Sequence, residues 1–477
     1  MRNKTGSKMN IEYFQRHPIL NRHSDLLEYV KRVYSDNDYK SFIIVPGRVN
    51  LIGEHVDYNH GPVLPCAIDR EIIFYLTKTN SGIVKISNIN PDYKEVTFSV
   101  RDPIEPYEKG NWGNYLKAGV KGIVDSFNQN NTINPEELCG FNAVISSTLP
   151  AAAGLSSSSS LVVGAALAIL AANDMPIDKL NVAEICAEAE HFVGTAGGGM
   201  DHAAILLGKK DSFLKINFNP LRTLSVPAPD DIDIILFHSL VEAEKSSHVR
   251  EEYNRRVLEC HLALDQFNRF ISDRLSNNLK PLKFLGEISA QYFNITASEM
   301  DSLISEFINS LPESYSLQEL LQLFNNTADE LTARYRHALR DGELREFTGG
   351  FKLKGRFRHV YSECQRVETA TTYLQHNEKV KLGKLLLASH KSLAEDYEVS
   401  TPEVDSIVNL LDGFGAYGCR IVGAGFGGMV LAISDRSKSD VLIERMKESF
   451  YSNKISENLD QYIIRCKTAD GAGVLSE

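Results

Sequence analysis

The chain has 477 residues, of which 43 % are hydrophobic and 24 % are charged. This composition is typical of a globular protein with two or three domains and excludes global disorder. The formal net charge of −11 makes nucleic acids and anionic membranes poor default partners, although one local pocket could still hold an anion.

The start of the chain is polar and lacks the apolar core of a signal peptide over residues 1–14. The longest apolar run, residues 161–172, is too short to span a bilayer and predicts a buried helix. Seven scattered cysteines without a C-x-x-C pair predict free thiols rather than a zinc site or a disulfide framework. These features predict a cytoplasmic protein.

The hydrophobic pattern mixes helices and strands. In the first half, a buried strand is expected at 42–45, ended by Pro46 and Gly47, and a helix at 181–193 precedes a glycine turn. Further strands are expected at 232–237, 419–422 and 429–433. Further long helices are expected at 247–269, 316–339, 356–374 and 381–393. Because the two kinds of element do not alternate strictly, the predicted fold class is α+β rather than a doubly wound sheet.

A glycine–serine run, Gly154 followed by Leu155 and five serines, begins the buried helix at 161–172. A helix N-terminus offers free N–H groups and a positive dipole end, so it binds phosphate well. A serine hydroxyl on the first turn can also bind Mg²⁺ beside a phosphate. Capping a buried helix is the simpler alternative, but it needs one serine and not five.

A second glycine motif, Gly423-Ala-Gly-Phe-Gly-Gly428, fits the pattern G-x-G-x-x-G. Dinucleotide binding requires a helix after these glycines, whereas the residues that follow predict a strand. The motif therefore predicts a glycine-walled turn that closes against a ligand, with a plain tight hairpin as the alternative.

Four polar residues, Arg48, Glu54, His55 and Asp57, lie within ten positions directly after the first strand. Carboxylates accept hydrogen bonds from vicinal hydroxyls, so Glu54 and Asp57 suit a sugar. Arg48 carries a fixed charge and could face a phosphate or a catalytic carboxylate. A purely structural charge network is an alternative, and a metal site lacks further ligands at a useful spacing.

Asp201 ends the glycine turn at 197–199 and could accept a proton in phosphoryl transfer, unless it only caps the next helix. Glu190, eleven residues upstream, could bind Mg²⁺, although an exposed helical glutamate is the simpler interpretation. The sequence has no G-x-x-x-x-G-K-[ST], H-R-D or D-F-G motif, which excludes P-loop NTPases and protein kinases.

Together and in this order, the motifs resemble those of the GHMP family of small-molecule kinases. Residues 46–59, PGRVNLIGEHVDYN, resemble the signature of its galactokinase branch. The glycine–serine run is similar to the family's ATP phosphate loop, and residues 423–428 to its third motif. Weaker similarities lie at 112–117, 251–260, 358–363 and 401–405. The glycine run before Asp201 most resembles the eukaryotic branch that holds galactokinases and N-acetylgalactosamine kinases, with His202 in place of the usual Gln.

The resemblance implies two α+β lobes, 1–215 and 216–477, with the active site in the cleft between them. Within the second lobe, the polar pattern of 272–314 predicts an irregular surface insertion. The implied reaction is that of a galactokinase, ATP and galactose to ADP and galactose 1-phosphate, with ATP and Mg²⁺ and a monomeric enzyme. N-acetylgalactosamine, arabinose and galacturonate remain possible substrates. A non-catalytic galactose and ATP sensor is disfavoured by the full-length serine run, and a mevalonate-type kinase by the polar signature.

The resemblance also implies a role for each matching residue. Asp201 would take the proton of the C1 hydroxyl, with Arg48 beside it and beside the transferring phosphoryl group. The implied sugar-binding residues are Arg48, Glu54, His55, Asp57, Gly198, Asp201 and Tyr253, where Tyr253 favours galactose. The implied nucleotide-binding residues are Trp112, Gly154, Leu155, Ser156, Ser157 and Ser158. The implied Mg²⁺ ligands are Ser158 and Glu190.

Overall fold

The computed structural model describes residues 19–33, 40–150, 154–194, 197–241, 247–274, 280–339, 342–455 and 459–475. The strands are β1 (Lys40–Asn50), β2 (Pro65–Thr79), β3 (Ile83–Asn88), β4 (Val96–Ser99), β5 (Gly140–Ser147), β6 (Ser212–Asn217), β7 (Arg222–Pro227), β8 (Ile232–His238), β9 (Gly418–Val422), β10 (Met429–Asp435), β11 (Ile463–Cys466) and β12 (Gly473–Leu475). They form a six-stranded sheet in the order β12-β1-β2-β5-β3-β4, a four-stranded sheet in the order β11-β8-β10-β9, and the hairpin β6-β7.

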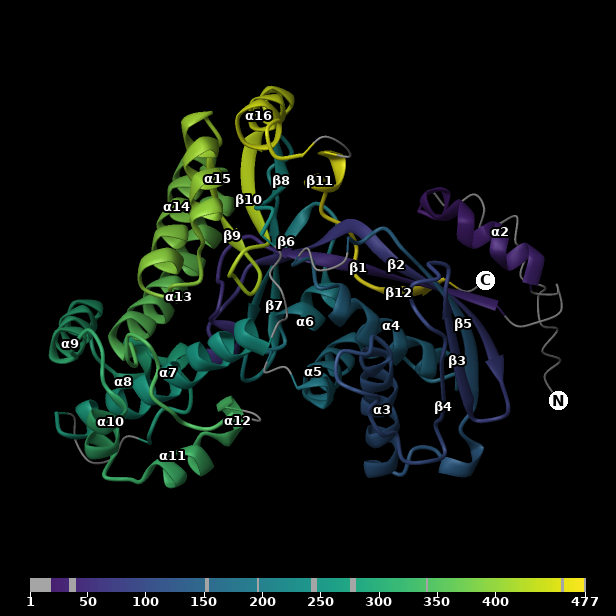
Figure 1. Ribbon diagram of the computed structural model, residues 1–477, viewed down its shortest axis with the longest axis horizontal. Coiled ribbons are helices and arrows are strands. Elements are labelled where there is room, and N and C mark those ends of the chain that lie inside the picture. Colours follow the sequence, from purple (N-terminus) through teal and green to yellow (C-terminus); the bar gives the residue numbers. More distant parts are fainter. Residues whose placement is uncertain are drawn as a thin grey trace.

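The helices lie around these sheets in two lobes, which confirms the α+β prediction (Figure 1). They are α2 (Ser24–Val33), α3 (Gly113–Gln129), α4 (Ser157–Ala172), α5 (Lys179–Ala189), α6 (Met200–Leu207), α7 (Ser247–Ser272), α8 (Ala290–Phe293), α9 (Ala297–Ser310), α10 (Leu317–Phe324), α11 (Ala328–Arg334), α12 (Arg336–Leu339), α13 (Leu353–Gln375), α14 (Lys379–Glu395), α15 (Pro402–Gly413) and α16 (Ser439–Met446). Among the residues described, no helix is both long and apolar enough to cross a membrane.

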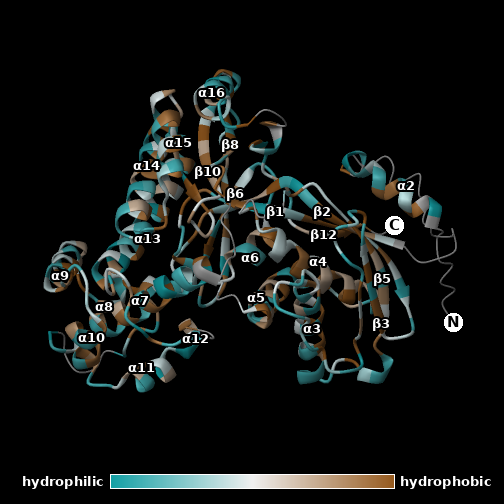
Figure 2. Ribbon diagram, in the orientation of Figure 1, coloured by the Kyte–Doolittle hydropathy of each residue, from teal (hydrophilic) through white to brown (hydrophobic). Residues whose placement is uncertain are grey.

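Helix α4 is the buried helix that the sequence predicts, and it packs against β1, β2 and α3. Figure 2 shows hydrophobic residues along α4 and along the strands of both sheets. The approach of α3 to α4 depends on Gly119, because a Cβ there would lie 2.1 Å from the carbonyl oxygen of Val162. The core thus fixes the N-terminus of α4, where the serine run begins.

Strand β1 does not end at Pro46 and Gly47, so the prediction of a strand limited to 42–45 is wrong in extent. The pairing of β1 with β2 shifts register between Pro46 and Arg48 and then continues to Asn50. A bulge of this kind absorbs a proline that lacks an N–H donor and redirects the side chains that follow. The bulge also brings the Arg48 N–H within 3.3 Å of the Leu155 carbonyl oxygen.

The glycine motif at 423–428 joins the antiparallel strands β9 and β10, as predicted. Four glycines in this turn have positive φ, as does Phe426 at +61°. Helices α13, α14 and α15 lie beside this sheet (Figure 1), with α14 and α15 packed on β9. A turn between antiparallel strands has no βαβ unit, so the dinucleotide interpretation is excluded.

Two predictions for the second lobe are wrong. The expected helix at 316–339 is three short helices, because Asn325 adopts a left-handed conformation (φ +51°) and Thr327 caps a new helix. The segment 272–314 is not irregular where it is described, since it contains α8 and α9. Helix α9 buries Met300, Ile304 and Phe307, an i, i+4, i+7 pattern hidden among polar residues.

The end of the chain returns to the first lobe. Strand β12 pairs with β1, and β11 pairs with β8 in the second lobe. The lobe limits 1–215 and 216–477 stay predictions, and β12 belongs to the sheet of the first lobe. All seven cysteines lie in the described residues as free thiols, five of them buried, as the sequence predicts.

Candidate active site

Arg48 and Asp201, 153 positions apart, form a bidentate ion pair. The Arg48 Nε donates to Asp201 Oδ1 at 2.7 Å, and its Nη2 donates to Asp201 Oδ2 at 2.9 Å. The third guanidinium nitrogen donates to the Gly154 carbonyl oxygen at 2.7 Å. The Ser156 hydroxyl donates to Asp201 Oδ2 at 2.5 Å. The structure therefore joins the predicted base, the predicted phosphoryl-facing arginine and the glycine–serine run.

Asp201 is held ionised by these partners. Burial raises the pKa of this carboxyl, but the Arg48 charge and the hydrogen bonds from Ser156 and Arg48 outweigh burial, so the pKa lies below its usual value. Asp201 in turn keeps Arg48 charged. Burial lowers the pKa of Arg48, but the nearby carboxylates of Asp201, Glu54 and Asp57 outweigh burial and raise this pKa. At neutral pH the pair is therefore a carboxylate beside a guanidinium, and its arginine is fixed in position by Gly154.

The glycine–serine run forms the first turn of α4. Gly154 and Ser156 both have positive φ, +70° and +59°, and Ser157 is the first residue of the helix. Ser157 and Ser158 are partly exposed, whereas Ser159 and Ser160 are buried. Opposite this turn lies the second glycine motif, because a Cβ on Gly423 would sit 3.5 Å from the Cα of Gly154. The N-terminus of α4 and the two glycine turns thus lie together, and free N–H groups of this kind suit a phosphate group.

Asp57 and Gly198 bring the 46–58 segment against the glycine turn before Asp201. The Gly198 N–H donates to Asp57 Oδ2 at 3.1 Å. A Cβ on Gly198 would lie 2.2 Å from the backbone carbon of Asp57, so only glycine allows this approach. Burial, followed by the charges of Asp201 and Glu54, raises the pKa of Asp57 to about 6. Three carboxylates thus converge on one site, where Arg48 pairs directly with Asp201.

The raised pKa of Asp57 leads to a stability prediction. The ionised form is disfavoured in the folded chain, so its cost to stability is absent below the unfolded pKa, grows as the pH rises from there to about 6, and is complete above that pH. Asp57→Asn is expected to stabilise the free protein by about 1–2 kcal/mol at pH 7.5 and by much less at pH 4.5. Urea unfolding at the two pH values measures this, and equal effects at both would contradict the assignment.

His55 points toward a cluster of three tyrosines. Its Nδ1 lies 3.0 Å from the Tyr58 hydroxyl, and its ring centroid lies 5.6 Å from that of Tyr253. The Tyr58 hydroxyl lies 2.5 Å from that of Tyr397. Burial and the nearby His359, Arg256 and Arg420 lower the pKa of His55 to about 3, so the imidazole is neutral. Tyr253 on α7 and His55 therefore face each other from the two lobes.

The Glu54 carboxylate lies in a buried network. Its Oε2 accepts from Arg420 Nη2 at 2.6 Å and from Asn50 at 3.0 Å, and its Oε1 accepts from the Gly423 N–H at 3.0 Å. Arg420 is fully buried on β9, directly before the second glycine motif. Glu54 thus fastens the 46–58 segment to the second lobe. Each carboxylate oxygen has two lone pairs, so Oε1 can still accept a hydrogen bond from a sugar hydroxyl. Sugar binding by Glu54 stays a prediction.

Glu190 lies at the start of a short 3-10 helix, Glu190–Val193, beside the serine run. The Ser159 hydroxyl, rather than that of Ser158, donates to its carboxylate, at 3.3 and 3.4 Å. His202 Nε2 lies 3.2 Å from Glu190 Oε2, which places the unusual histidine against the predicted metal ligand. The serine hydroxyls and the carboxylate are oxygen donors beside a phosphate-binding turn, so this set fits Mg²⁺.

Sequence reasoning missed several residues of the site. Tyr58, Tyr397 and Arg420 contact predicted residues but were not singled out, and neither was Ser156 as a partner of Asp201. An arginine inside the buried strand pattern at 419–422 was a usable signal for Arg420. Trp112 caps the start of α3 and donates from its indole nitrogen to the Lys94 carbonyl oxygen at 3.0 Å. Its position beside an adenine stays a prediction.

Three family models match the chain. They describe the galactokinase galactose-binding signature at residues 31–78, the N-terminal domain of GHMP kinases at 114–209 and their C-terminal domain at 370–452. The first match covers Arg48, Glu54, His55 and Asp57. The second covers the glycine–serine run and Asp201, and the third covers the second glycine motif. The matched segments therefore contain the residues that the fold brings together.

Whole-chain comparisons agree with these matches. A galactokinase of Actinobacillus succinogenes is 30 % identical over 432 residues, covering 88 % of this chain and 94 % of that protein. A galactokinase of Dictyostelium discoideum is 29 % identical over 469 residues, covering 91 % and 89 %. The crystal structure of Lactococcus lactis galactokinase complexed with galactose has the same fold, with a TM-score of 0.72 at 24 % identity, covering 95 % and 99 % of the two chains. The chain belongs to the galactokinase family of GHMP kinases.

Proposed function

We propose that this protein transfers the γ-phosphoryl group of ATP to the C1 hydroxyl of galactose. The observation that carries the proposal is the bidentate pair of Arg48 and Asp201, held against the N-terminus of α4. A carboxylate kept ionised there can accept the hydroxyl proton, and the guanidinium and the free N–H groups of α4 can offset charge on the phosphoryl oxygens. A proton acceptor and groups that offset the phosphoryl charge therefore lie side by side.

The chain's own residues divide the work. Asp57, His55, Tyr253 and the Gly198 backbone lie around the sugar, and Asp201 points to its C1 hydroxyl. Ser156 and Arg48 fix the orientation of the Asp201 carboxylate, so the proton acceptor is ready before substrate binds. The second glycine motif and the serine run enclose the phosphates. Ser158 and Glu190 would hold Mg²⁺, which supplies positive charge to the β- and γ-phosphates when bound.

The substrate test measures ADP release with Mg-ATP and a panel of sugars: galactose, N-acetylgalactosamine, arabinose, galacturonate and glucose. We expect strong turnover with galactose and little with the acetylated sugar, since the bulky Tyr253 ring lies in the proposed sugar site, with its centroid 5.6 Å from that of His55 and 5.7 Å from that of Tyr58. A preference for N-acetylgalactosamine would leave the proposed phosphoryl transfer unchanged but would show that galactose is the wrong substrate. Sugar and ATP binding without turnover would favour the sensor alternative.

The metal assignment has its own test. Ser158→Ala and Glu190→Gln are expected to raise the Mg²⁺ concentration for half-maximal activity by about tenfold or more, because even the loss of a residue that only hydrogen-bonds a metal ligand typically lowers metal affinity by about 10–100-fold. Ser157→Ala is the matched control from the same turn and is expected to change it less than twofold. Binding of Mn²⁺ in the presence of a non-hydrolysable ATP analogue, followed by electron paramagnetic resonance, should give the same order. If Ser157→Ala has the larger effect, the ligand is assigned to the wrong serine.

A cytoplasmic location and a monomeric state complete the proposal. Seven free thiols suit a reducing compartment. Size-exclusion chromatography with light scattering at several concentrations measures the oligomeric state, and a mass of 53.2 kDa is expected.

A further inference from the structure

The short connection between α14 and α15 contacts both the tyrosine cluster and the second glycine motif. The Tyr397 hydroxyl reaches that of Tyr58, which in turn contacts His55 Nδ1. Two residues later, the Val399 carbonyl oxygen accepts from the Phe426 N–H at 2.7 Å. Residues 396–399 thus support the proposed sugar pocket on one side and the glycine turn on the other.

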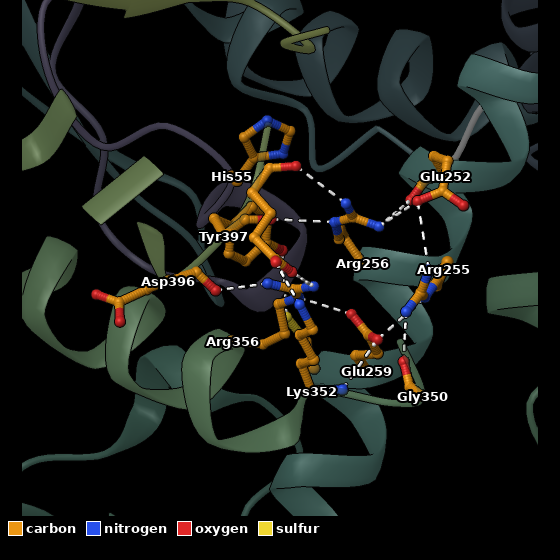
Figure 3. Close-up of polar contacts among 12 residues, drawn as sticks. His55, Glu252, Arg255, Arg256, Glu259, Gly350, Lys352, Arg356, Asp396 and Tyr397 are labelled. Carbon is orange, nitrogen blue, oxygen red and sulfur yellow. Dashed lines mark hydrogen bonds and ion pairs between the residues drawn. The ribbon is translucent and has the colours of Figure 1, made fainter. Parts of the chain in front are cut away.

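This connection has a backbone conformation that needs support. Glu398 has φ +57°, in the left-handed region that side-chain-bearing residues adopt rarely. The neighbouring backbone carbonyls point to guanidinium groups from two helices (Figure 3). Arg356 of α13 donates to the Asp396 carbonyl oxygen and to the Glu398 carboxylate, and it is also bound to Glu259. Removing Arg356 would therefore disturb several helices at once.

Arg256 makes a more local set of contacts. Its Nε donates to the Tyr397 carbonyl oxygen at 3.0 Å, and its Nη2 donates to the Glu398 carbonyl oxygen at 2.9 Å. Its Nη1 donates to Glu252 Oε2 at 2.6 Å, and its guanidinium carbon lies 5.5 Å from the ring centroid of Phe426. The side chain is 5 % exposed. One guanidinium thus bridges the two carbonyls of the supporting segment and also reaches the glycine turn.

Helix α7 carries both Tyr253 and, three residues later, Arg256, which places the two on neighbouring turns. We propose that Arg256 is a positioning residue for galactose: it fixes α7 to residues 397 and 398 and thereby holds Tyr253, Tyr58 and His55 in one arrangement. The proposal rests on the proposed binding of galactose. Arg256 itself is assigned no contact with the sugar.

Arg255, next to it on α7, is a matched control. It is 7 % exposed and also lies near Glu252, with its Nη1 at 3.5 Å from Oε2. Among the residues drawn in Figure 3, its other partners are Glu259 and the Gly350 carbonyl oxygen, and no contact joins it to Asp396 or Tyr397. Both arginines belong to the same buried charge network, but only Arg256 reaches the segment behind the sugar pocket.

The test compares Arg256→Lys with Arg255→Lys. Lysine keeps the charge beside Glu252 but cannot donate to two carbonyls with the fixed geometry of a guanidinium. Isothermal titration calorimetry with galactose alone is expected to show a tenfold or greater rise in Kd for Arg256→Lys and less than a twofold change for Arg255→Lys. Steady-state kinetics should place the Arg256 effect in KM for galactose, with kcat changed less than threefold. Thermal unfolding should show a similar loss of Tm in both variants.

A second variant covers the case in which Arg256→Lys does not fold. Tyr397→Phe removes only the hydroxyl that meets Tyr58, and a threefold or greater rise in the galactose Kd is expected. Equal Kd changes in the Arg255 and Arg256 variants, or unchanged galactose binding in Arg256→Lys or in Tyr397→Phe, would overturn the positioning role. Absence of galactose binding by the unaltered protein would instead overturn the proposed function.

Discussion

Asp201→Asn is expected to lower kcat for galactose by about 10²–10⁴-fold, the range by which a positioned proton acceptor accelerates a reaction. The amide of asparagine has nearly the shape of the carboxylate but takes no proton from the C1 hydroxyl. Its NH₂ group would also face a donor, because Arg48 and Ser156 both donate to Asp201. Coupled measurement of ADP release gives kcat and KM.

Asp57→Asn is the matched control for this substitution, since it changes another carboxylate of the same site. This substitution is expected mainly to raise KM for galactose, by about 10–100-fold. It weakens hydrogen bonds from the sugar to a charged carboxylate, and such a bond contributes about 1.5–3 kcal/mol. Calorimetry should show that Asp201→Asn still binds galactose. Near-normal kcat for Asp201→Asn would exclude Asp201 as the proton acceptor.

Arg48→Met is expected to lower kcat by about 10²–10³-fold, comparable to the loss of one preorganised donor to developing negative charge. The substitution also leaves Asp201 buried without its cation. Burial raises the pKa of Asp201, and the arginine and the hydrogen bonds lower it, so removing the arginine must move this pKa upward. Since the ionised carboxylate is the active form, the acid limb of the pH profile of kcat should shift to higher pH.

Arg70→Met in β2 is a control for the loss of a partly buried arginine outside the site, where the guanidinium bonds, among the described residues, to its neighbour Asp69. It is expected to change kcat less than twofold. Arg48→Lys separates charge from geometry, because lysine restores the positive charge without the bidentate contact. If lysine restores the acid limb but not kcat, the positive charge sets the pKa of Asp201 and the bidentate geometry is needed for turnover. An unshifted acid limb in Arg48→Met would contradict the coupling to Asp201.

The residues of the site could be predicted where a short stretch of sequence contains several side chains suited to sugar or phosphate. The 46–58 segment, the serine run and the glycine turn before Asp201 each contain residues that suit sugar or phosphate. The turn at 423–428 was predictable too, because an apolar strand pattern follows the glycines. The pairing of Arg48 with Asp201, 153 positions away, followed only from the resemblance to a family, because no pattern near Arg48 itself indicates its partner. The contact of its third guanidinium nitrogen with the Gly154 carbonyl oxygen was not predicted.

The errors have separate physical causes. At Pro46 the general preference of proline to end a strand was overridden by a bulge, so β1 continues to Asn50. At 316–339 the apolar pattern continues through Asn325, but this residue adopts a left-handed conformation that ends α10. The bulge depends on the pairing of β1 with β2, which the sequence alone does not record, whereas Asn325 and the Thr327–Glu330 capping box are local signals that the apolar pattern outweighed.

The tyrosine cluster illustrates a third kind of omission. Tyr58 lies inside the sugar signature and Tyr397 lies 339 positions further along the chain, and each alone is an ordinary core tyrosine. Only the fold brings their hydroxyls together beside His55. A residue that only positions another residue cannot be found from motifs, because the residues around it in the sequence do not form a recognisable binding or catalytic pattern.

The pairing of β12 with β1 also bears on how the protein is made. Synthesis on the ribosome releases β1 long before its partner at residues 473–475, which emerges only after residues 51–472 have been translated. Until then, β1 has an open edge along Phe42, Ile43 and Ile44, a short apolar stretch able to pair with another nascent chain. The first lobe is therefore expected to depend on chaperones that shield this edge, and a stop codon in place of residue 473 should reduce the yield of folded protein more than the loss of residues 473–477 alone suggests.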